Sequence, residues 1–255
     1  MDSDLELART LADIADEITV ANYRSISLKV ETKPDLTPVT EADKSVEQAI
    51  RKLLQAQRPN DGIIGEEFAS TQTKSNRTWV IDPIDATKNY VRGVPVWATL
   101  IGLLEDGVPT LGFVSAPAMG RRWWAESGNG AFTQDVNGQV RQIYVSAIRN
   151  IQDASFSYSD SVGWLPQVLD KLQALTWRSR AFGDFWSHLL VAEGAVDIAA
   201  EPELNSWDMV AFAAIVAEAG GRVTGFNGND LLIAGNALTT NGLLHEIALK
   251  AVSQT

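Results

Sequence analysis

The chain has 255 residues, 45% of them hydrophobic, which suffices for one large domain or two closely joined halves. It contains no cysteine, which excludes disulfides, thiolate metal ligands and cysteine nucleophiles and fits a reducing cytoplasm. The formal net charge of −11 repels nucleic acid and anionic membranes, so neither is an expected partner. No apolar run is long enough to cross a bilayer.

The first half of the chain is expected to contain two helices followed by strands. An amphipathic pattern predicts a helix over residues 1–23, and a second helix begins near Thr40. The apolar run Thr78–Ile81 predicts a strand that ends at Asp82. Further strands are expected over residues 96–104, 108–115 and 121–126.

The second half alternates short strands with helices. Strands are expected near residues 142–146, 154–158, 177–181, 196–200 and 222–226. Helices are expected near 162–175, 184–194, 206–219 and 241–253. A soft boundary near Asn137-Gly138 divides residues 1–137 from 138–255, as two halves of one compact catalytic unit. The mixture predicts a layered α/β (α+β) architecture.

The stretch Asp82-Pro83-Ile84-Asp85 carries two carboxylates at the end of a buried strand. Burial disfavours two adjacent negative charges, and a divalent cation removes the conflict. Ligands that are all oxygen favour a hard ion such as Mg²⁺. The alternative is an aspartate that caps a helix after a proline turn.

Three other acidic positions have both a chemical and a structural interpretation. Glu66, in Gly65-Glu66-Glu67, is a metal ligand or a solvated glutamate after a turn. Asp43 accepts a hydrogen bond from the Thr87 hydroxyl, so that the two orient and deprotonate a water, or it completes a capping box with Thr40. Asp208 is a metal ligand from the second half or a favourable acid in the first turn of a helix.

A further run, from Arg180 to Trp186, suggests contacts to the part of a substrate that is not phosphate. Asp184 in this run and Glu201 further on are the candidate contacts, with Arg180 at the start of the run. The alternative is a glycine turn into a helix that Asp184 caps.

Three motifs in order make the chain resemble the inositol monophosphatase family of Mg²⁺-dependent, lithium-sensitive phosphatases. These are Gly65-Glu66-Glu67, Asp82-Pro83-Ile84-Asp85-Ala86-Thr87, and Trp207-Asp208 followed by Glu218-Ala219-Gly220-Gly221. More narrowly, the chain resembles the histidinol-phosphate phosphatases of that family. This resemblance rests on the stretches 91–99, 120–125 and 183–194.

The resemblance implies an αβαβα sandwich, assembled as a homodimer, and a role for each matching residue. Glu66, Asp82 and the Ile84 carbonyl would hold one Mg²⁺. Asp82, Asp85 and Asp208 would hold a second, and a third, more weakly held ion would lie near Glu66. Asp43 and Thr87 would activate the attacking water. Glu66, as a metal ligand, counts with them among the catalytic residues. The backbone amides of Ala86 and Thr87, at a helix N-terminus, would receive the phosphate.

Ala86 departs from the family pattern, which has glycine at this position. Alanine keeps the amide, but at positive φ it carries a strain of about 1–2 kcal/mol. A phosphometabolite-binding protein with weakened catalysis is therefore an alternative of another class.

Among enzymes, histidinol phosphate is the expected substrate, because acidic Asp85, Asp184 and Glu201 suit its amine and imidazole. An inositol or broad sugar monophosphatase and a nucleoside bisphosphate nucleotidase are the alternatives.

Overall fold

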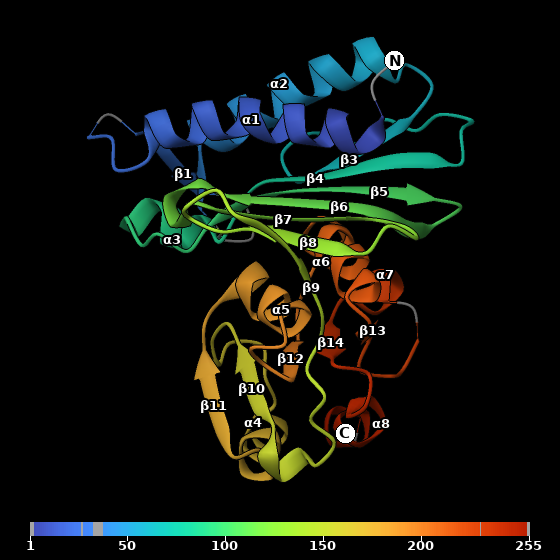
Figure 1. Cartoon of the computed structure of the whole chain (residues 1–255). Helices are drawn as coiled ribbons and strands as arrows, with labels where there is room; N and C mark the ends of the chain where they lie inside the picture. The colour runs from blue at the N-terminus through green and yellow to red at the C-terminus, as the bar shows by residue number, and fades with distance from the viewer. Residues whose placement is uncertain (1–2, 27, 33–37, 230, 254–255) are drawn as a thin grey trace.

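A computed structural model of the chain describes residues 3–26, 28–32, 38–229 and 231–253. It contains three sheets (Figure 1). The large sheet consists of seven strands in the order β3 (Gly62–Gly65), β4 (Arg77–Asp85), β5 (Ala98–Glu105), β6 (Val108–Ala116), β7 (Arg121–Glu126), β8 (Ala131–Gln134) and β9 (Val140–Ile143). The second sheet consists of β11 (Arg178–Ala181), β10 (Ser155–Tyr158), β12 (Ile198–Glu201), β14 (Ala237–Thr240) and β13 (Arg222–Thr224) in that order. A small hairpin pairs β1 (Val30–Thr32) with β2 (Pro38–Thr40).

Helices separate and cover the two large sheets, which confirms the predicted αβαβα sandwich (Figure 1). Helices α1 (Asp4–Asn22) and α2 (Glu41–Gln57) cover the outer face of the seven-stranded sheet. Helices α5 (Asp184–Ala192) and α6 (Ser206–Glu218) lie between the sheets. Helices α4 (Pro166–Leu175) and α8 (His245–Val252) pack on the outer face of the five-stranded sheet. Short helices α3 (Thr87–Arg92) and α7 (Leu231–Ala234) complete the described chain.

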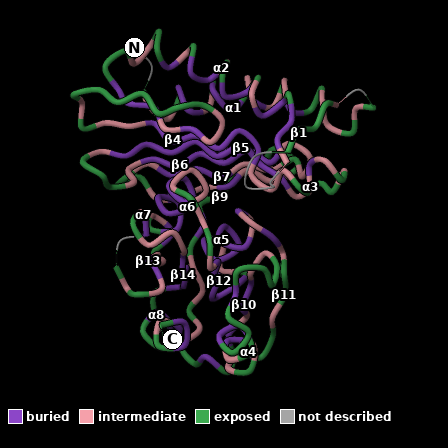
Figure 2. Tube along the Cα trace, turned by 180° about the vertical axis from the view of Figure 1, so that it is seen from behind, coloured by how far each residue is buried: buried purple, intermediate pink, exposed green. Residues whose placement is uncertain are grey.

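Each helix follows from its pattern of apolar residues. In α1, Leu7, Leu11 and Ala15 form the buried stripe of an amphipathic surface helix. Helix α6 differs, because every residue from Met209 to Val216 is buried. A helix that is apolar on all sides belongs between two layers, which is its position here. Figure 2 shows the resulting burial along the inner strands and α6, with exposed residues mainly at loops and edges.

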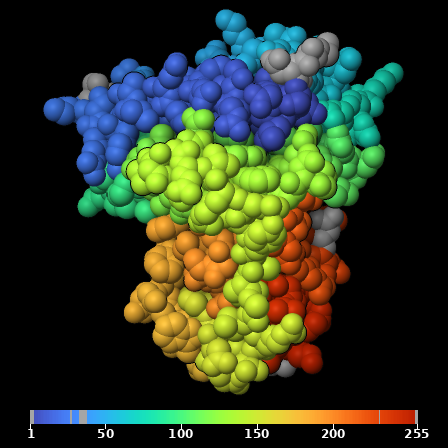
Figure 3. All heavy atoms as spheres, in the orientation of Figure 1, coloured from blue at the N-terminus to red at the C-terminus, as the bar shows by residue number. Residues whose placement is uncertain are grey.

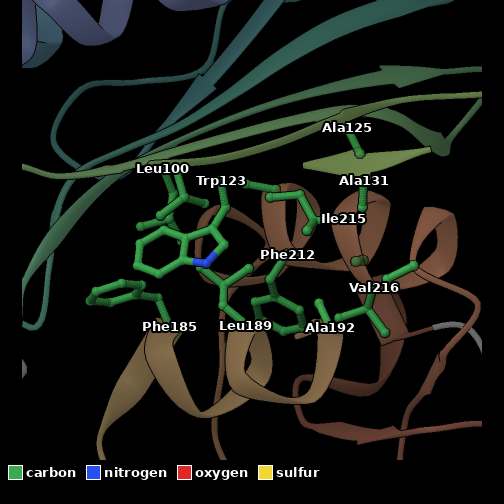
Figure 4. Close-up of a cluster of buried hydrophobic side chains, with 14 of the residues drawn as sticks. Leu100, Trp123, Ala125, Ala131, Phe185, Leu189, Ala192, Phe212, Ile215 and Val216 are labelled. Atoms are coloured by element: carbon green, nitrogen blue, oxygen red, sulfur yellow. The ribbon is translucent and has the colours of Figure 1, made fainter. Parts of the chain in front are cut away.

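The middle layer makes a close contact with the large sheet (Figure 4). Gly102 on β5 and Gly112 on β6 are paired across the ladder, directly beneath α6. A Cβ on Gly112 would lie 2.0 Å from the Ala211 carbonyl oxygen, and one on Gly102 would lie 2.4 Å from Val210. The glycines therefore let α6 approach the sheet closely, and this brings Asp208 near the end of β4.

Most predicted elements are present. Five short strands were not predicted: β1, β2, β3, β8 and β14, of which β14 lies between β12 and β13. The expected strand near residues 142–146 is β9, which pairs with β8 in the first sheet. Asn137-Gly138 lies at the turn between those two strands, so the chain changes sheets only after Ile143. Figure 3 shows that the two parts meet along a continuous surface, with the upper part wider than the lower.

Candidate active site

The end of β4 contains an irregularity that turns both aspartates of Asp82-Pro83-Ile84-Asp85 toward one place. Residues three apart on a regular strand point to opposite faces. Here the ladder to β5 shifts between Asp82 and Asp85, which pair with Leu100 and Ala98. The extra residue on β4 restores the two carboxylates to a common side. Pro83 suits this position because it cannot donate a ladder hydrogen bond.

Asp208 completes the cluster from the other half of the chain. Carboxylate oxygens of Asp82, Asp85 and Asp208 all lie within 4.8 Å of one another. Asp82 is 2% exposed. Within the described residues, none of the three has an ion pair with a lysine, arginine or histidine. The arrangement therefore gathers negative charge in a buried place without a protein cation.

The surroundings favour protonation of all three carboxyl groups. Burial raises the pKa of Asp82 well above its usual range, and Glu66 and the other aspartates raise it further. Burial likewise raises the pKa of Asp85, with Asp184 and Asp208 adding to the effect. The pKa of Asp208 rises to about 7, also mainly through burial. Carboxyl groups in this condition are suited to bind a hard divalent cation.

Glu66 reaches this region because β3 runs parallel to β4. Gly65, the last residue of β3, pairs with Ile81, so Glu66 follows directly beside Asp82. Glu66 lines a cavity beside the cluster, and its charge raises the pKa of Asp82, Asp85 and Asp208. The structure thus places Glu66 at the cavity beside the acidic cluster, although it is not one of the three aspartates whose oxygens lie within 4.8 Å of one another.

Asp43 forms the expected capping box with Thr40, and one of its carboxylate oxygens has no hydrogen-bond partner. Its Oδ2 accepts hydrogen bonds from the backbone amide of Thr40 at 2.8 Å and from the Thr40 hydroxyl at 2.5 Å, which completes a capping box. Its Oδ1 is buried without a hydrogen-bond partner. Burial, opposed by the bonds to Thr40, raises the pKa of Asp43 to about 6.

The expected hydrogen bond from Thr87 to Asp43 is wrong for this structure. The Thr87 hydroxyl instead donates to the carbonyl of Ile84 at 2.9 Å. Thr87 is the first residue of α3 and Ile84 lies in the bulge, so this local partner is close by. The Ile84 carbonyl keeps a second lone pair, so its proposed role as a metal ligand is compatible with this bond.

Ala86 adopts the left-handed conformation, with φ 64° and ψ 46°. The strain expected for alanine at positive φ therefore applies to this residue. Ala86 also precedes α3, so the structure gives it, rather than Asp82 or Asp85, the cap position of that helix.

A cavity of about 560 Å³ opens beside the cluster, between the two halves of the chain. Asp85 connects the two halves of the chain, because its Oδ2 accepts a hydrogen bond from the Phe185 amide at 2.9 Å. Lining residues include Glu66, Asp85, Ala86, Thr87, Lys88, Ser159, Asp160, Phe182, Asp184, Phe185, His188, Glu201 and Asp208. The cavity is therefore a feature of the seam between the halves.

Glu201 and Asp184 form an acidic wall of this cavity, as the sequence suggests. Glu201 is 4% exposed; its Oε2 accepts a hydrogen bond from Ser159 at 2.7 Å, and its Oε1 has no partner. Burial raises the pKa of Glu201 to about 8. Gly183 occupies the N-cap position of α5 and Asp184 is the first helical residue, so Asp184 is not the cap residue itself. Burial also raises its pKa.

Arg180 does not reach this cavity. It is exposed on β11, where its guanidinium donates to the carbonyl of Ser179, and it borders a separate shallow hollow. Alternation along β11 separates it from Ala181, which does line the cavity beside the acidic cluster. The assignment of Arg180 to substrate binding therefore lacks support in this chain's geometry.

Sequence reasoning missed the roles of two polar residues that line the cavity, the buried His188 and the half-buried Ser159. His188 on α5 stacks on Phe212, with ring centroids 3.9 Å apart, and its Nδ1 is 2.8 Å from the Thr239 hydroxyl. Burial lowers the pKa of His188 to about 3, so the ring is neutral. Ser159 holds Glu201. The sequence signal for His188 was a polar side chain inside the largely apolar α5, whereas Ser159 lies just after β10 and gave no such signal.

The fold, the strand-end carboxylates and the seam cavity together agree with one family. The model of the inositol monophosphatase family matches residues 1–255, and the chain belongs to that family. It is a phosphoric monoester hydrolase. The histidinol-phosphatase of Mycobacterium tuberculosis is 52% identical, over 96% of each chain. That of Streptomyces coelicolor is 53% identical, over 98% of this chain and 97% of the relative.

Solved structures agree with this assignment. The extragenic suppressor protein suhB from Bartonella henselae superposes with a TM-score of 0.90 at 28% identity, covering 99% of both chains. The Thermotoga maritima IMPase gives a TM-score of 0.87 at 30% identity, covering 98% of this chain and 97% of that one. In the described part of this chain, no helix is both long and apolar enough to span a membrane.

Proposed function

We propose that this chain hydrolyses L-histidinol phosphate to L-histidinol and phosphate in histidine biosynthesis, with Mg²⁺ as its cofactor. The observation that supports this substrate is the pair of acidic residues Asp184 and Glu201 in the cavity wall, where Glu201 is buried with one oxygen unpartnered. The two relatives above, both named histidinol-phosphatase, support the same substrate.

The acidic cluster fits Mg²⁺, because its donors are all oxygen and no protein cation neutralises them within the described residues. We assign Glu66, Asp82 and the Ile84 carbonyl to one ion, and Asp82, Asp85 and Asp208 to a second. A third, weaker ion near Glu66 is part of the proposal. Bound Mg²⁺ lowers the pKa of a water, neutralises phosphate oxygens and stabilises the leaving alkoxide.

The residues around the cluster complete the reaction. The amides of Ala86 and Thr87 stand at the start of α3, where first-turn amides have no acceptor within the helix, and they would receive the phosphate. Asp43 offers a buried, unpartnered Oδ1 that would accept a proton from the attacking water. Thr87 would orient that water once its hydroxyl turns from the Ile84 carbonyl.

The cavity wall that contains Asp184 and Glu201 would select the alcohol part of the phosphate ester. Asp184 and Glu201 lie there, and an ammonium or imidazolium group would give the free oxygen of Glu201 its missing partner. An uncharged polyol would leave those carboxylates without a compensating positive charge. The acidic wall therefore favours a cationic alcohol over inositol, although Glu201 alone discriminates less than the pair.

Phosphate release by the purified protein with Mg²⁺ tests this proposal. Specificity constants are compared for histidinol phosphate, inositol 1-phosphate, fructose 1,6-bisphosphate and adenosine 3′,5′-bisphosphate. A preference of about 100-fold for histidinol phosphate, about 2.7 kcal/mol, is the expected result. Asp184→Ala should raise the Michaelis constant for histidinol phosphate more than that for inositol 1-phosphate.

Other outcomes have definite meanings. A flat profile would make the protein a general monophosphatase, and equal effects of Asp184→Ala on both substrates would leave that residue a structural role. Absence of turnover with every substrate would favour a binding protein whose catalysis the strained Ala86 weakens.

Lithium gives an independent test of the metal assignment. Li⁺ carries one charge and would replace a Mg²⁺ in the acidic cluster without supplying the same stabilisation. We expect inhibition at millimolar concentrations, measured as phosphate release at fixed Mg²⁺, with equal concentrations of NaCl as the control. Complete insensitivity to Li⁺ would contradict the assignment.

Assembly and location stay predictions that rest on the family resemblance and on composition. We expect a homodimer in the cytoplasm, acting on a small phosphorylated metabolite without nucleic acid or membrane partners. Light scattering of the purified protein measures the first of these directly.

A further inference from the structure

Glu47, a buried glutamate on α2, lies against the strand end that carries Glu66. Its side chain is 0% exposed and pairs with Arg51, one helical turn later, at 2.7 Å. Asp43, Glu47 and Arg51 follow one another at intervals of four residues and therefore share one face of α2. That face runs from the active site along the loop after β3.

The Glu47 carboxylate fixes the backbone directly after Glu66. Its Oε2 accepts a hydrogen bond from the Glu67 amide at 2.7 Å, and its Oε1 accepts one from the Phe68 amide at 3.3 Å. Arg51 adds a bond to the Phe68 carbonyl at 3.1 Å. Three backbone groups beyond Glu66 are thus held by one buried ion pair.

The backbone before Glu66 is held by the same carboxylate through close packing. A Cβ on Gly65 would lie 2.0 Å from Glu47 Oε1 and 2.3 Å from its Cδ. Gly65 is therefore required for space, and its pairing with Ile81 on β4 fixes it from the other side. Glu66 stands between two anchored neighbours.

We propose that Glu47 is a positioning residue that holds Glu66 in its place for Mg²⁺ before the ion arrives. Glu66 faces like charges, since it raises the pKa of Asp82 and Asp208. Without an anchor, that repulsion moves Glu66 away from the cluster in the metal-free protein. Each binding event then has to reorder the segment, which weakens affinity.

The test uses Glu47→Gln, which keeps the shape but loses the charge opposite Arg51 and one acceptor oxygen. Mg²⁺ binding is measured by titration calorimetry without substrate, and the Mg²⁺ concentration for half-maximal activity is measured separately. We expect affinity to fall about 10–100-fold, as for other residues that orient metal ligands. The maximal rate should largely return at saturating Mg²⁺. Exchange of the Glu67 and Phe68 amides in the metal-free protein should accelerate.

Asp61→Asn is the matched control for lost stability. Asp61 is also a buried carboxylate, and it accepts bonds from Arg77 at 3.2 Å and Trp79 at 3.1 Å, away from the cavity. The control should lose stability and leave Mg²⁺ affinity unchanged. If Glu47→Gln and Asp61→Asn bind Mg²⁺ as tightly as the wild type, the positioning role is overturned.

A milder variant covers the case in which Glu47→Gln does not fold. Arg51→Lys keeps the positive charge beside Glu47 but lacks the geometry to bond the Phe68 carbonyl as well. A several-fold loss of Mg²⁺ affinity supports the proposal, and unchanged affinity contradicts it. The inference rests on the proposed metal site: if the wild-type protein binds no Mg²⁺, that site fails, whereas wild-type binding with unaffected variants overturns the role of Glu47 alone.

Discussion

The two ends of β4 differ in whether their carboxylates are paired with a cationic side chain. At its first residue, Arg77 pairs with Asp4 at 2.6 Å, with Asp61 at 3.2 Å and with Glu105. At its last residues, Asp82 and Asp85 meet Asp208 without a cation among the described residues. The strand is shared, so the difference lies in the partners that the rest of the fold supplies.

This difference separates structural acids from those available for chemistry. A paired carboxylate stabilises the fold, and removal of one partner leaves an uncompensated charge. A clustered, unpaired carboxylate opposes folding until a cation arrives, as the raised pKa of Asp82 and of Asp85 indicates. The same substitution should therefore have opposite consequences at the two ends of the strand.

The largest expected effect comes from Asp85→Asn. The amide cannot supply a negative ligand to the second Mg²⁺, which should lower the rate at least about 1,000-fold. The retained oxygen still accepts the Phe185 amide, so the seam should stay intact. Phosphate release and thermal unfolding without Mg²⁺ measure the two effects. We expect the melting temperature of the metal-free variant to be unchanged or raised.

Near the first residue of β4, Asp61→Asn should have the opposite effects: a loss of stability with little change in activity. The loss of a charged acceptor for Arg77 and Trp79 should lower the free energy of unfolding by about 1.5–3 kcal/mol. Activity at saturating Mg²⁺ should remain near that of the wild type. Chemical denaturation measures the loss, and comparable destabilisation of the metal-free protein by Asp85→Asn would refute the contrast between the two ends.

Glu201→Gln extends the comparison to the cavity wall. The loss of the carboxylate, which a bound cation would hold in its ionised form, should lower the specificity constant for histidinol phosphate by about 10–100-fold, the value of a charged hydrogen bond. The constant for inositol 1-phosphate should change much less. A uniform loss for both substrates would assign Glu201 to the architecture of the cavity rather than to selection.

The same variant should remove a dependence of stability on pH. Because burial raises the pKa of Glu201 to about 8, the folded protein binds this proton more tightly than the unfolded chain does. Its contribution to stability is present below about pH 4.5 and is lost as the pH rises through about 8. Denaturation at pH 5 and pH 8.5 should show Glu201→Gln gaining stability relative to the wild type at the higher pH.

The sequence predicts that Asp82 and Asp85 come together, because their spacing reflects local structure. A buried strand that ends in Asp82-Pro83-Ile84-Asp85 leaves few alternatives, and the bulge follows from proline and the need to bury Ile84. Several acids satisfy both interpretations at once: Asp43 and Asp208 complete capping boxes and also face the site. The capping bonds of Asp43 use Oδ2 and leave Oδ1 without a partner, so for this residue the alternatives do not exclude each other.

The prediction fails where function depends on tertiary partners. The position of Arg180 outside the cavity follows from the side of β11 on which it lies, and a run of polar residues does not reveal that side. The role inferred for Glu47 depends on a loop twenty residues away. Strand β14 was missed because its short run, Ala237–Thr240, becomes a strand only between β12 and β13.

The smallest effect is expected at Ala86, where the backbone rather than charge carries the strain. At φ 64°, glycine avoids the contact between Cβ and the following carbonyl, although it also loses the packing of the methyl group beside Ile84 and Tyr90. We expect Ala86→Gly to raise the free energy of unfolding by about 1 kcal/mol, measured by chemical denaturation. Ala118→Gly is the control, because Ala118 packs on the same cluster without positive φ and should lose stability. If Ala86→Gly also loses stability, packing of the methyl group outweighs the backbone strain, and a binding protein weakened by that strain loses its physical basis.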